Sequence, residues 1–247
     1  MIEANSKILI DIQNVTKSFG DNEVLKGVSM QLYENENLVV LGKSGSGKSV
    51  LIKCIVNLLE QDSGIIKVIN LEVNKNNDED LLTIREKIGF LFQGAALYDS
   101  MTVRENLTFP LTRTKKKTNV DNIEEKIIEA LENVSLPESI DKMPSELSGG
   151  MKKRIGLART LITNPKILLY DEPTTGLDPI TSDEISDLIN LTKEKYKTSS
   201  IIITHDIKCV KAVADRIIML KDGIVYKEGT LQEFENDQDD YIKSFFN

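Results

Sequence analysis

The stretch Leu38-Val39-Val40-Leu41-Gly42-Lys43-Ser44-Gly45-Ser46-Gly47-Lys48-Ser49 is the most informative part of this 247-residue chain. Its four leading apolar residues predict a buried strand that stops at Gly42, and a helix is expected over residues 48–59. The loop between them fits G-x-x-x-x-G-K-[ST], whose glycines let successive backbone N–H groups converge on phosphates. Because the following helix adds the positive end of its dipole, the stretch predicts a nucleoside triphosphate site.

Side chains at the end of this loop predict how the nucleotide is held. Lys48 is expected to reach the β- and γ-phosphates, and the Ser49 hydroxyl is expected to bind Mg²⁺. Kinases and GTPases share the loop pattern, but a GTPase would need N-K-x-D, and the stretch Asn74-Lys75-Asn76-Asn77 lacks the Asp. The loop residues expected to contact the nucleotide are Gly42, Lys43, Ser44, Gly45, Ser46, Gly47, Lys48, Ser49 and Val50.

The composition is that of an ordinary globular protein, with 40% hydrophobic and 28% charged residues, which excludes a disordered or fibrous chain. Its net charge of −8 is unsuited to general nucleic-acid binding, so no nucleic-acid partner is expected. One histidine and two cysteines cannot form a four-ligand zinc site, and Cys54 and Cys209 are expected to be small buried side chains. No apolar run approaches 18 residues and the start does not resemble a signal peptide, so a cytoplasmic location is expected.

Strands and helices alternate at both ends of the chain, which favours an α/β fold with a parallel sheet and right-handed crossovers. A helix is expected over 179–196, a polar loop over 74–80, and a solvated connection around Lys115, Lys116 and Lys117. Strands are predicted over residues 8–12, 24–32, 38–41, 65–69, 88–92, 167–170, 200–204 and 216–220.

Helical spacing replaces the strands between residues 94 and 163. An amphipathic stripe is formed there by Ile123, Ile127, Ile128, Leu131 and Val134. No segment repeats at a fixed period. We therefore expect one composite domain over residues 1–247, with a catalytic core at about 1–93 and 164–247 and a helical subdomain inserted at about 94–163.

Two acids end the strand at 167–170. Asp171 is expected at the carboxyl edge of the sheet beside the phosphate loop, where it can hold Mg²⁺. Strand alternation places Glu172 on the opposite face, where it could polarise a water for attack on the γ-phosphate. His205, the only histidine, follows another apolar strand and could hydrogen-bond the γ-phosphate and the attacking water.

The stretch Leu147-Ser148-Gly149-Gly150-Met151 begins a predicted helix and resembles the signature motif of ATP-binding cassette (ABC) proteins. The resemblance covers essentially the whole chain. Gln93 matches the Q-loop of the family, the stretch Thr175-Gly176-Leu177-Asp178 its D-loop, His205 its switch histidine, and Phe19 the aromatic residue that stacks on adenine.

This resemblance implies the ABC ATPase fold, in which a P-loop NTPase (RecA-like) parallel sheet core carries an N-terminal antiparallel β-subdomain and an inserted α-helical subdomain. It implies ATP and Mg²⁺ as cofactors. The residues that it makes catalytic are Glu172, His205 and Gln93, and those that it assigns to Mg²⁺ are Ser49, Gln93 and Asp171.

The resemblance also implies a second copy of the chain as a partner. Ser148, Gly149 and Gly150 offer a hydroxyl and backbone N–H groups at a helix N-terminus, which can bind an anion. In the family this segment caps the γ-phosphate held by the other subunit of a head-to-tail dimer, and Asp178 would also act in trans. Met151 stands where Gln is usual; the anion-binding atoms precede it, so activity is expected to survive.

Three further stretches resemble the ATPase of Mla-type phospholipid transporters, which work with a multispan permease and an MCE-type lipid-binding protein. They cover residues 92–100, 105–111 and 170–180. This implies an ATPase subunit held at the inner face of the cell membrane through its permease. The alternatives are the ATPase of an importer for amino acids or other small solutes, and an ABC ATPase that signals through a membrane partner. An ABC ATPase that acts on nucleic acid is disfavoured, because the chain has one cassette and no coiled-coil insert or metal module.

Residues 95–100, just after Gln93, are expected to meet the permease. Their small and apolar side chains, Leu97 among them, suit a groove that receives a short permease helix and moves when two cassettes close. The alternative is that Ala95, Ala96 and Leu97 pack inside the helical subdomain.

Overall fold

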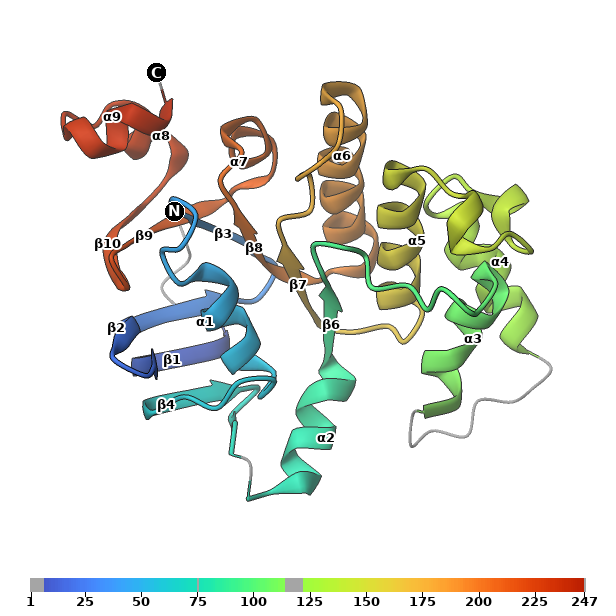
Figure 1. The fold of residues 1–247 in the computed structure, drawn as a ribbon, viewed down its shortest axis with the longest axis horizontal. Helices are drawn as coiled ribbons and strands as arrows, with labels where there is room; N and C mark the ends of the chain where they lie inside the picture. Colours follow the sequence, from blue (N-terminus) through green and yellow to red (C-terminus); the bar gives the residue numbers. More distant parts are fainter. Residues whose placement is uncertain (1–6, 75, 114–121, 247) are drawn as a thin grey trace.

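The computed structural model describes residues 7–74, 76–113 and 122–246, and the predicted lysine connection at 115–117 lies outside them (Figure 1). Within these residues the strands form a four-stranded antiparallel sheet in the order β2-β1-β4-β5 and a six-stranded sheet in the order β10-β9-β3-β8-β7-β6. The strands are β1 Ile8–Phe19, β2 Asn22–Tyr33, β3 Asn37–Leu41, β4 Ser63–Val68, β5 Leu71–Glu72, β6 Ile88–Leu91, β7 Ile167–Asp171, β8 Ser199–Thr204, β9 Arg216–Lys221 and β10 Ile224–Gly229.

Helices connect these strands and also form a separate group between β6 and β7. They are α1 Lys48–Ile55, α2 Asp78–Lys87, α3 Val103–Arg113, α4 Ile123–Glu132, α5 Gly149–Leu161, α6 Pro179–Tyr196, α7 Ile207–Val213, α8 Leu231–Glu235 and α9 Asp240–Phe246. Single 3₁₀ turns at Pro137–Ser139 and Pro144–Glu146 lead into α5. In the described residues, no helix combines the length and the apolar character that a membrane crossing would need.

The larger sheet confirms the predicted α/β architecture. Strands β9, β3, β8, β7 and β6 are parallel, and β10 adds an antiparallel edge. All residues of β3, β7 and β8 are buried, as expected for strands covered on both faces. Because carboxyl ends of parallel strands meet at one edge, the loop after β3, the acids at the end of β7 and His205 after β8 come together there.

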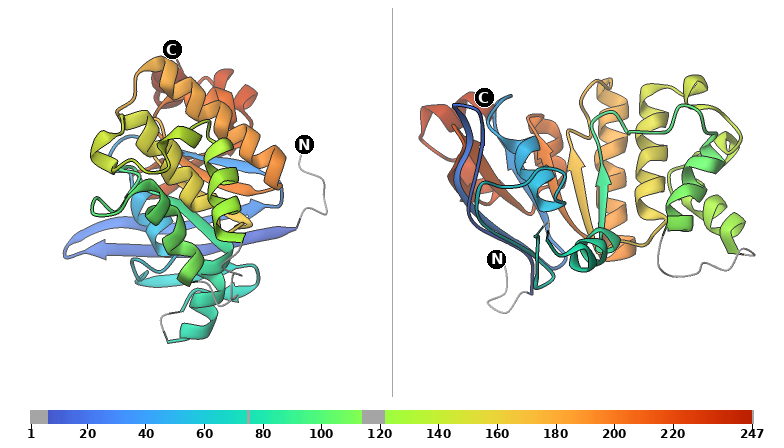
Figure 2. Two further views of the ribbon diagram at one scale, coloured as in Figure 1. Left: turned by 90° about the vertical axis from the view of Figure 1, so that its right-hand side faces the viewer. Right: turned by 60° about the horizontal axis from the view of Figure 1, so that its bottom comes forward.

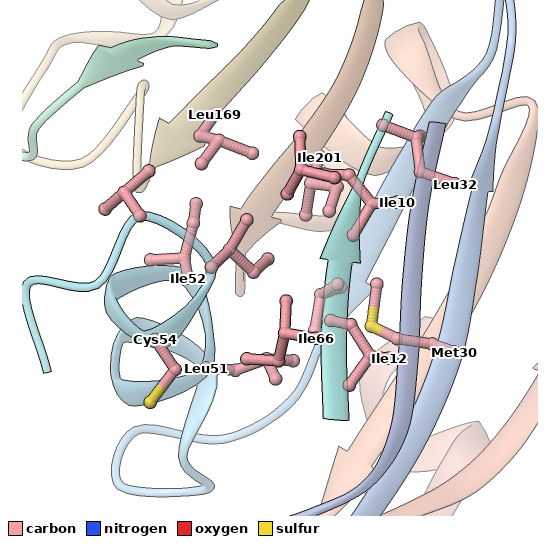
Figure 3. Close-up of a cluster of buried hydrophobic side chains, with 14 of the residues drawn as sticks. Ile10, Ile12, Met30, Leu32, Leu51, Ile52, Cys54, Ile66, Leu169 and Ile201 are labelled. Atoms are coloured by element: carbon pink, nitrogen blue, oxygen red, sulfur yellow. The ribbon is translucent and has the colours of Figure 1, made fainter. Parts of the chain in front are cut away.

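Helix α1 lies between the two sheets and joins them through one apolar core. Figure 3 shows Leu51 and Ile52 of α1 within this cluster, opposite Ile10 and Ile12 of β1. Cys54, fully buried in the same cluster, has a free thiol, as does Cys209 on the other face of the larger sheet. Both cysteines therefore have the buried packing role that the sequence predicts.

The opposite face of the larger sheet is covered by α6, α7 and the two C-terminal helices. Ile189 of α6, Val210 of α7, Phe234 of α8 and Ile242 of α9 are buried in one cluster with residues of the sheet. The end of the chain thus docks on the same body as the phosphate-binding loop.

Helices α3, α4 and α5 gather at the end of the molecule away from β1, β2 and β4 (Figures 1 and 2). Ile127 and Leu131 of the predicted stripe are buried in the core of this group, whereas Ile128 is 42% exposed. Leu157 and Leu161 of α5 pack instead with the larger sheet. Helix α5 therefore ties the helical group to the catalytic core.

Three predicted boundaries are wrong by several residues. Strand β1 continues to Phe19 rather than ending at residue 12, because it pairs with β2 along its length. Helix α1 stops at Ile55 rather than at residue 59, because Asn57 adopts a left-handed conformation (φ 52°) and closes a turn onto the carbonyl of Cys54. Helix α2 begins at Asp78, inside the predicted polar loop. Asn77 caps it by accepting from the N–H of Asp80, and acids in its first turn suit the helix dipole.

Candidate functional site

The loop after β3 has the backbone that a phosphate cradle needs. Gly45 and Gly47 lie in the left-handed region, with φ of 82° and 101°, which favours glycine. A Cβ on Gly42 would stand 2.5 Å from the carbonyl oxygen of Leu220 on β9, so only glycine fits there. The glycines of the sequence pattern are thus demanded by conformation and by close packing.

Lys48 and Ser46 line the inside of this loop. The Lys48 ammonium donates to the carbonyls of Gly42 at 2.7 Å and Lys43 at 3.1 Å. Burial lowers the pKa of Lys48, an effect that Glu172 and Asp171 partly offset. The hydroxyl of Ser46 is buried and has no hydrogen-bond partner among the described residues. A buried cation beside an unsatisfied hydroxyl fits the phosphates of a nucleotide.

Ser49 and Asp171 form a pair of oxygen donors suited to Mg²⁺. The Ser49 hydroxyl, in the first turn of α1, donates to Oδ1 of Asp171 at the end of β7, at a distance of 2.9 Å. Hydroxyl and carboxylate oxygens are the donors that Mg²⁺ prefers, and it often keeps water and phosphate as its other ligands. These residues fit the predicted metal role, since both lie beside the loop.

Glu172 does not lie on the face opposite to Asp171, as strand alternation suggested. It follows the last residue of β7 and has a left-handed backbone (φ 51°), so its carboxylate also turns toward the loop. One oxygen lies 3.8 Å from the Lys48 ammonium; the other accepts from the Thr175 hydroxyl and lies 2.8 Å from Nδ1 of His205. The two acids therefore serve one site from the same side.

Lys48, Ser49, Glu172 and His205 border a pocket of about 510 Å³ that contains most of the predicted site. Phe19, 48% exposed at the end of β1, lines it together with Gln93 and His205. Asn22 and Val24 of β2 also line the pocket and were not predicted, because nothing in their spacing distinguishes them. The predicted residues that line it are Phe19, Ser44, Gly45, Gly47, Lys48, Ser49, Val50, Gln93, Glu172 and His205.

The residues expected to act in trans lie outside this pocket. Ser148 is the N-cap of α5 and accepts from the N–H of Met151, while Gly150 packs so closely on Thr181 of α6 that a Cβ would stand 2.5 Å from its methyl group. Asp178 caps α6, accepting from the N–H groups of Ile180 and Thr181. Its carboxylate thus has a role within its own chain that the sequence pattern did not predict.

Two basic residues of α5, the buried Lys153 and the half-buried Arg159, reach functional segments and were also missed. Lys153 donates to the backbone carbonyl of Glu172 at 3.0 Å. Arg159 donates to the carbonyls of Ala95 and Ala96, both of which have a left-handed backbone. The signal was available for Lys153, because it falls on the same helical stripe as Leu157 and Leu161.

A groove of about 510 Å³ lies between β6 and the helical group, next to the segment after Gln93. Ala96 and Tyr98 line it, as predicted for residues 95–100, whereas Ala95 is buried and Leu97 packs against the core of the helical group. The expectation that Leu97 faces the groove is therefore wrong. Three aromatic and three basic residues are part of the remaining lining: Phe90, Phe92, Phe109, Arg85, Arg113 and Arg159.

Comparison with known proteins agrees with this geometry. A family profile described as "ABC transporter" matches residues 25–175. The solved structure titled as the dimeric post-hydrolysis state of the ATP-binding cassette MJ0796, bound to ADP and Pi, superposes with a TM-score of 0.81 at 35% identity. The match covers 90% of this chain and 99% of that one.

Curated relatives match over nearly the whole chain. The chloroplastic protein TRIGALACTOSYLDIACYLGLYCEROL 3 of Arabidopsis thaliana is 37% identical over 261 residues, covering 99% of this chain and 75% of its own length. The methionine import ATP-binding protein MetN of Clostridium tetani is 36% identical, with 91% of this chain and 70% of its own length covered.

Proposed function

Because the chain belongs to the ABC transporter family, in which it is an ATP-hydrolysing subunit that uses ATP and Mg²⁺, we propose that it closes on a second copy of itself to drive a separate membrane permease. The observation that carries the proposal is the division of the functional residues between two surfaces. Lys48, Glu172 and His205 border one pocket, while Ser148 and Gly149 are exposed elsewhere, where a second chain can bring its nucleotide.

The surface around Asp178, which is expected to act on the nucleotide of the other subunit, also suits dimer closure. Ile180, two residues after Asp178, is 74% exposed, the highest value among the exposed large apolar side chains of the described residues. In a head-to-tail dimer with isologous symmetry, both copies would bury this surface. Hydrolysis would then release the two chains, so that ATP shifts the population between closed and open states.

The shared-site arrangement is tested by mixing two inactive variants. Ser148→Arg fills the position of the partner's γ-phosphate, and Lys48→Ala removes the phosphate cation, so neither homodimer should hydrolyse ATP. A heterodimer purified through two different affinity tags retains one intact site and should recover up to half of the wild-type rate. Normal hydrolysis by the Ser148→Arg homodimer would rule out the shared site.

We propose that the groove next to Tyr98 receives a short helix of the permease that carries an acidic side chain. The groove has aromatic walls, with the Tyr98 and Phe109 rings 4.9 Å apart, and three arginines supply positive charge at its surface. Aromatic and arginine side chains are enriched at interface centres, which supports a protein partner. Arg113 is exposed and lies over the Phe109 ring.

Charge reversal tests this docking site. Arg113→Glu should abolish co-purification with the permease in detergent while leaving ATP binding by the isolated subunit intact. Lys126→Glu is the matched control, since Lys126 is exposed on α4 of the same helical group and does not line the groove. A complex that survives Arg113→Glu and transports normally would exclude this groove.

The substrate that we propose is a phospholipid, with an Mla-type permease and an MCE-type lipid-binding protein as partners at the inner face of the cell membrane. The support is the resemblance of residues 92–100, 105–111 and 170–180 to that branch, together with an Arabidopsis relative whose name contains a galactolipid. The second candidate is an amino acid, because relatives named for methionine and arginine transport are similarly close.

Reconstitution separates the two substrates. The complex in proteoliposomes should move a fluorescent phospholipid between membranes when ATP is supplied, and the same complex carrying Glu172→Gln should not. Uptake of labelled methionine or arginine, with no ATP-dependent lipid movement, would overturn the phospholipid proposal in favour of the importer.

A further inference from the structure

Lys153 connects the signature segment to the candidate general base of the same chain. It lies one turn into α5, the helix that begins directly after Ser148, and its side chain is 5% exposed. The ammonium donates to the backbone carbonyl of Glu172 at 3.0 Å. This bond crosses from the helical group to the catalytic core.

The backbone of Glu172 is fixed on both sides by hydrogen bonds. Its N–H donates to the carbonyl of Ile203 on β8 at 2.9 Å, and its carbonyl accepts from Lys153 and from the N–H of Thr175. A left-handed backbone is unfavourable for a non-glycine residue, so it persists only where surrounding contacts hold it. Lys153 is the charged member of those contacts.

A lysine buried for packing alone would be unfavourable at this position. Desolvation lowers the pKa of Lys153 to about 8, although the carboxylates of Glu172 and Asp171 oppose the effect. An apolar side chain would fill the same stripe of α5 without that cost. The hydrogen bond to the Glu172 carbonyl therefore accounts for a lysine at this position.

We propose that Lys153 is a positioning residue that transmits the placement of the signature segment to the carboxylate of Glu172. The proposal rests on the shared-site dimer, in which the signature segment of a chain serves one ATP and Glu172 of that chain serves the other. Lys153 then lies between the two sites. Movement of α5 on engaging the partner's nucleotide would reorient the Glu172 carbonyl and, with it, the carboxylate.

The first test compares kcat with KM for ATP in homodimers of the full chain. Lys153→Met should lower kcat by up to about 10²-fold, the effect of misplacing a catalytic group by about 1 Å, with KM changed less than about threefold. Lys153→Arg keeps a donor and should recover most of kcat. Lys166→Met, which removes an exposed lysine directly before β7, is the control. Unchanged kcat in a folded Lys153→Met protein would overturn the proposal.

The second test asks in which site Lys153 acts. In a heterodimer with Lys48→Ala in one chain, only the site built on the other chain's Lys48 and Glu172 can turn over. Lys153→Met in that other chain should lower the rate, whereas Lys153→Met placed in the Lys48→Ala chain should lower it much less. The reverse ranking would mean that Lys153 shapes the signature segment and would refute positioning of Glu172. If the reference heterodimer carrying Lys48→Ala alone is inactive, the comparison is repeated with Glu172→Gln in place of Lys48→Ala, because that chain should still bind ATP for the partner's signature segment to engage. If this dimer is inactive too, the shared-site function fails, and the homodimer kinetics still decide the role of Lys153.

Discussion

Nδ1 of His205 lies 2.8 Å from Oε2 of Glu172, so the only histidine and the candidate general base form one unit at the edge of the sheet. The Glu172 side chain is 11% exposed and the His205 side chain is 57% exposed. The buried Glu172 carboxylate thus orients the accessible His205 ring, which can contact a bound nucleotide.

Glu172→Gln should bind ATP normally and lose hydrolysis by about 10²–10⁴-fold, because the amide keeps the shape but cannot accept the proton of the attacking water. Single-turnover hydrolysis and equilibrium binding of a fluorescent ATP analogue separate the two effects. Retention of near wild-type turnover would exclude Glu172 as the base.

His205→Ala should also reduce turnover, by about 10²–10⁴-fold, because it removes the group that can contact both the γ-phosphate and the attacking water. The measurement is steady-state ATPase activity of the assembled transporter. His205→Gln serves as a companion variant. Its turnover should lie between that of the wild type and that of His205→Ala, because the amide can retain one hydrogen bond. Equal rates for all three proteins would give His205 a purely structural role.

Asp171→Asn should raise the Mg²⁺ concentration needed for half-maximal ATPase activity by about 10–100-fold, because the amide keeps the bond from Ser49 but removes the negative charge. Nucleotide binding in EDTA should be unaffected. An unchanged Mg²⁺ titration would exclude Asp171 from the metal site.

The stability of the wild type relative to Lys153→Met should rise with pH. The pKa of Lys153 is lowered from 10.5 to about 8 on folding, so between these values the unfolded chain binds more protons than the folded one. Stability is therefore gained between about pH 8 and pH 10.5, with a slope of at most about 1.4 kcal/mol per pH unit. Urea unfolding at pH 7.5 and 9.5 measures the difference, and Lys166→Met should track the wild type. Parallel curves for wild type and Lys153→Met would contradict the shift.

Neither cysteine should react with a thiol reagent in the native protein at pH 8. Burial raises the pKa of Cys54 to about 11 and that of Cys209 to about 12, and the reactive species is the thiolate. Mass spectrometry after iodoacetamide treatment should show no addition in buffer and two additions in urea. Rapid modification of either thiol in buffer would show that its helix opens readily.

The sequence by itself determined the local parts of the site. The glycines and Lys48 of the phosphate loop, the acids at the end of β7 and the histidine after β8 could be predicted, because a strand edge and a helix N-terminus fix their surroundings within a few residues. The apolar strands and the stripe of α4 were predictable for the same reason, since burial imposes a short period on the sequence.

Boundaries set by weaker signals were missed. Helix α2 has only Leu81 and Ile84 buried, and its start depends on the Asn77 cap and the helix dipole rather than on an apolar stripe. Helix α1 ends four residues early because Asn57 adopts a left-handed conformation. A single polar residue in an apolar sequence does not predict that conformation.

Only the tertiary structure decided how distant segments meet. It turned Glu172 onto the same side as Asp171, placed Leu97 in the helical core rather than in the groove, and brought Lys153 to the Glu172 carbonyl, 19 positions away. Periodicity assigns a side chain to a face of its own strand or helix, but the contact that it makes depends on how those elements pack, which long-range burial decides.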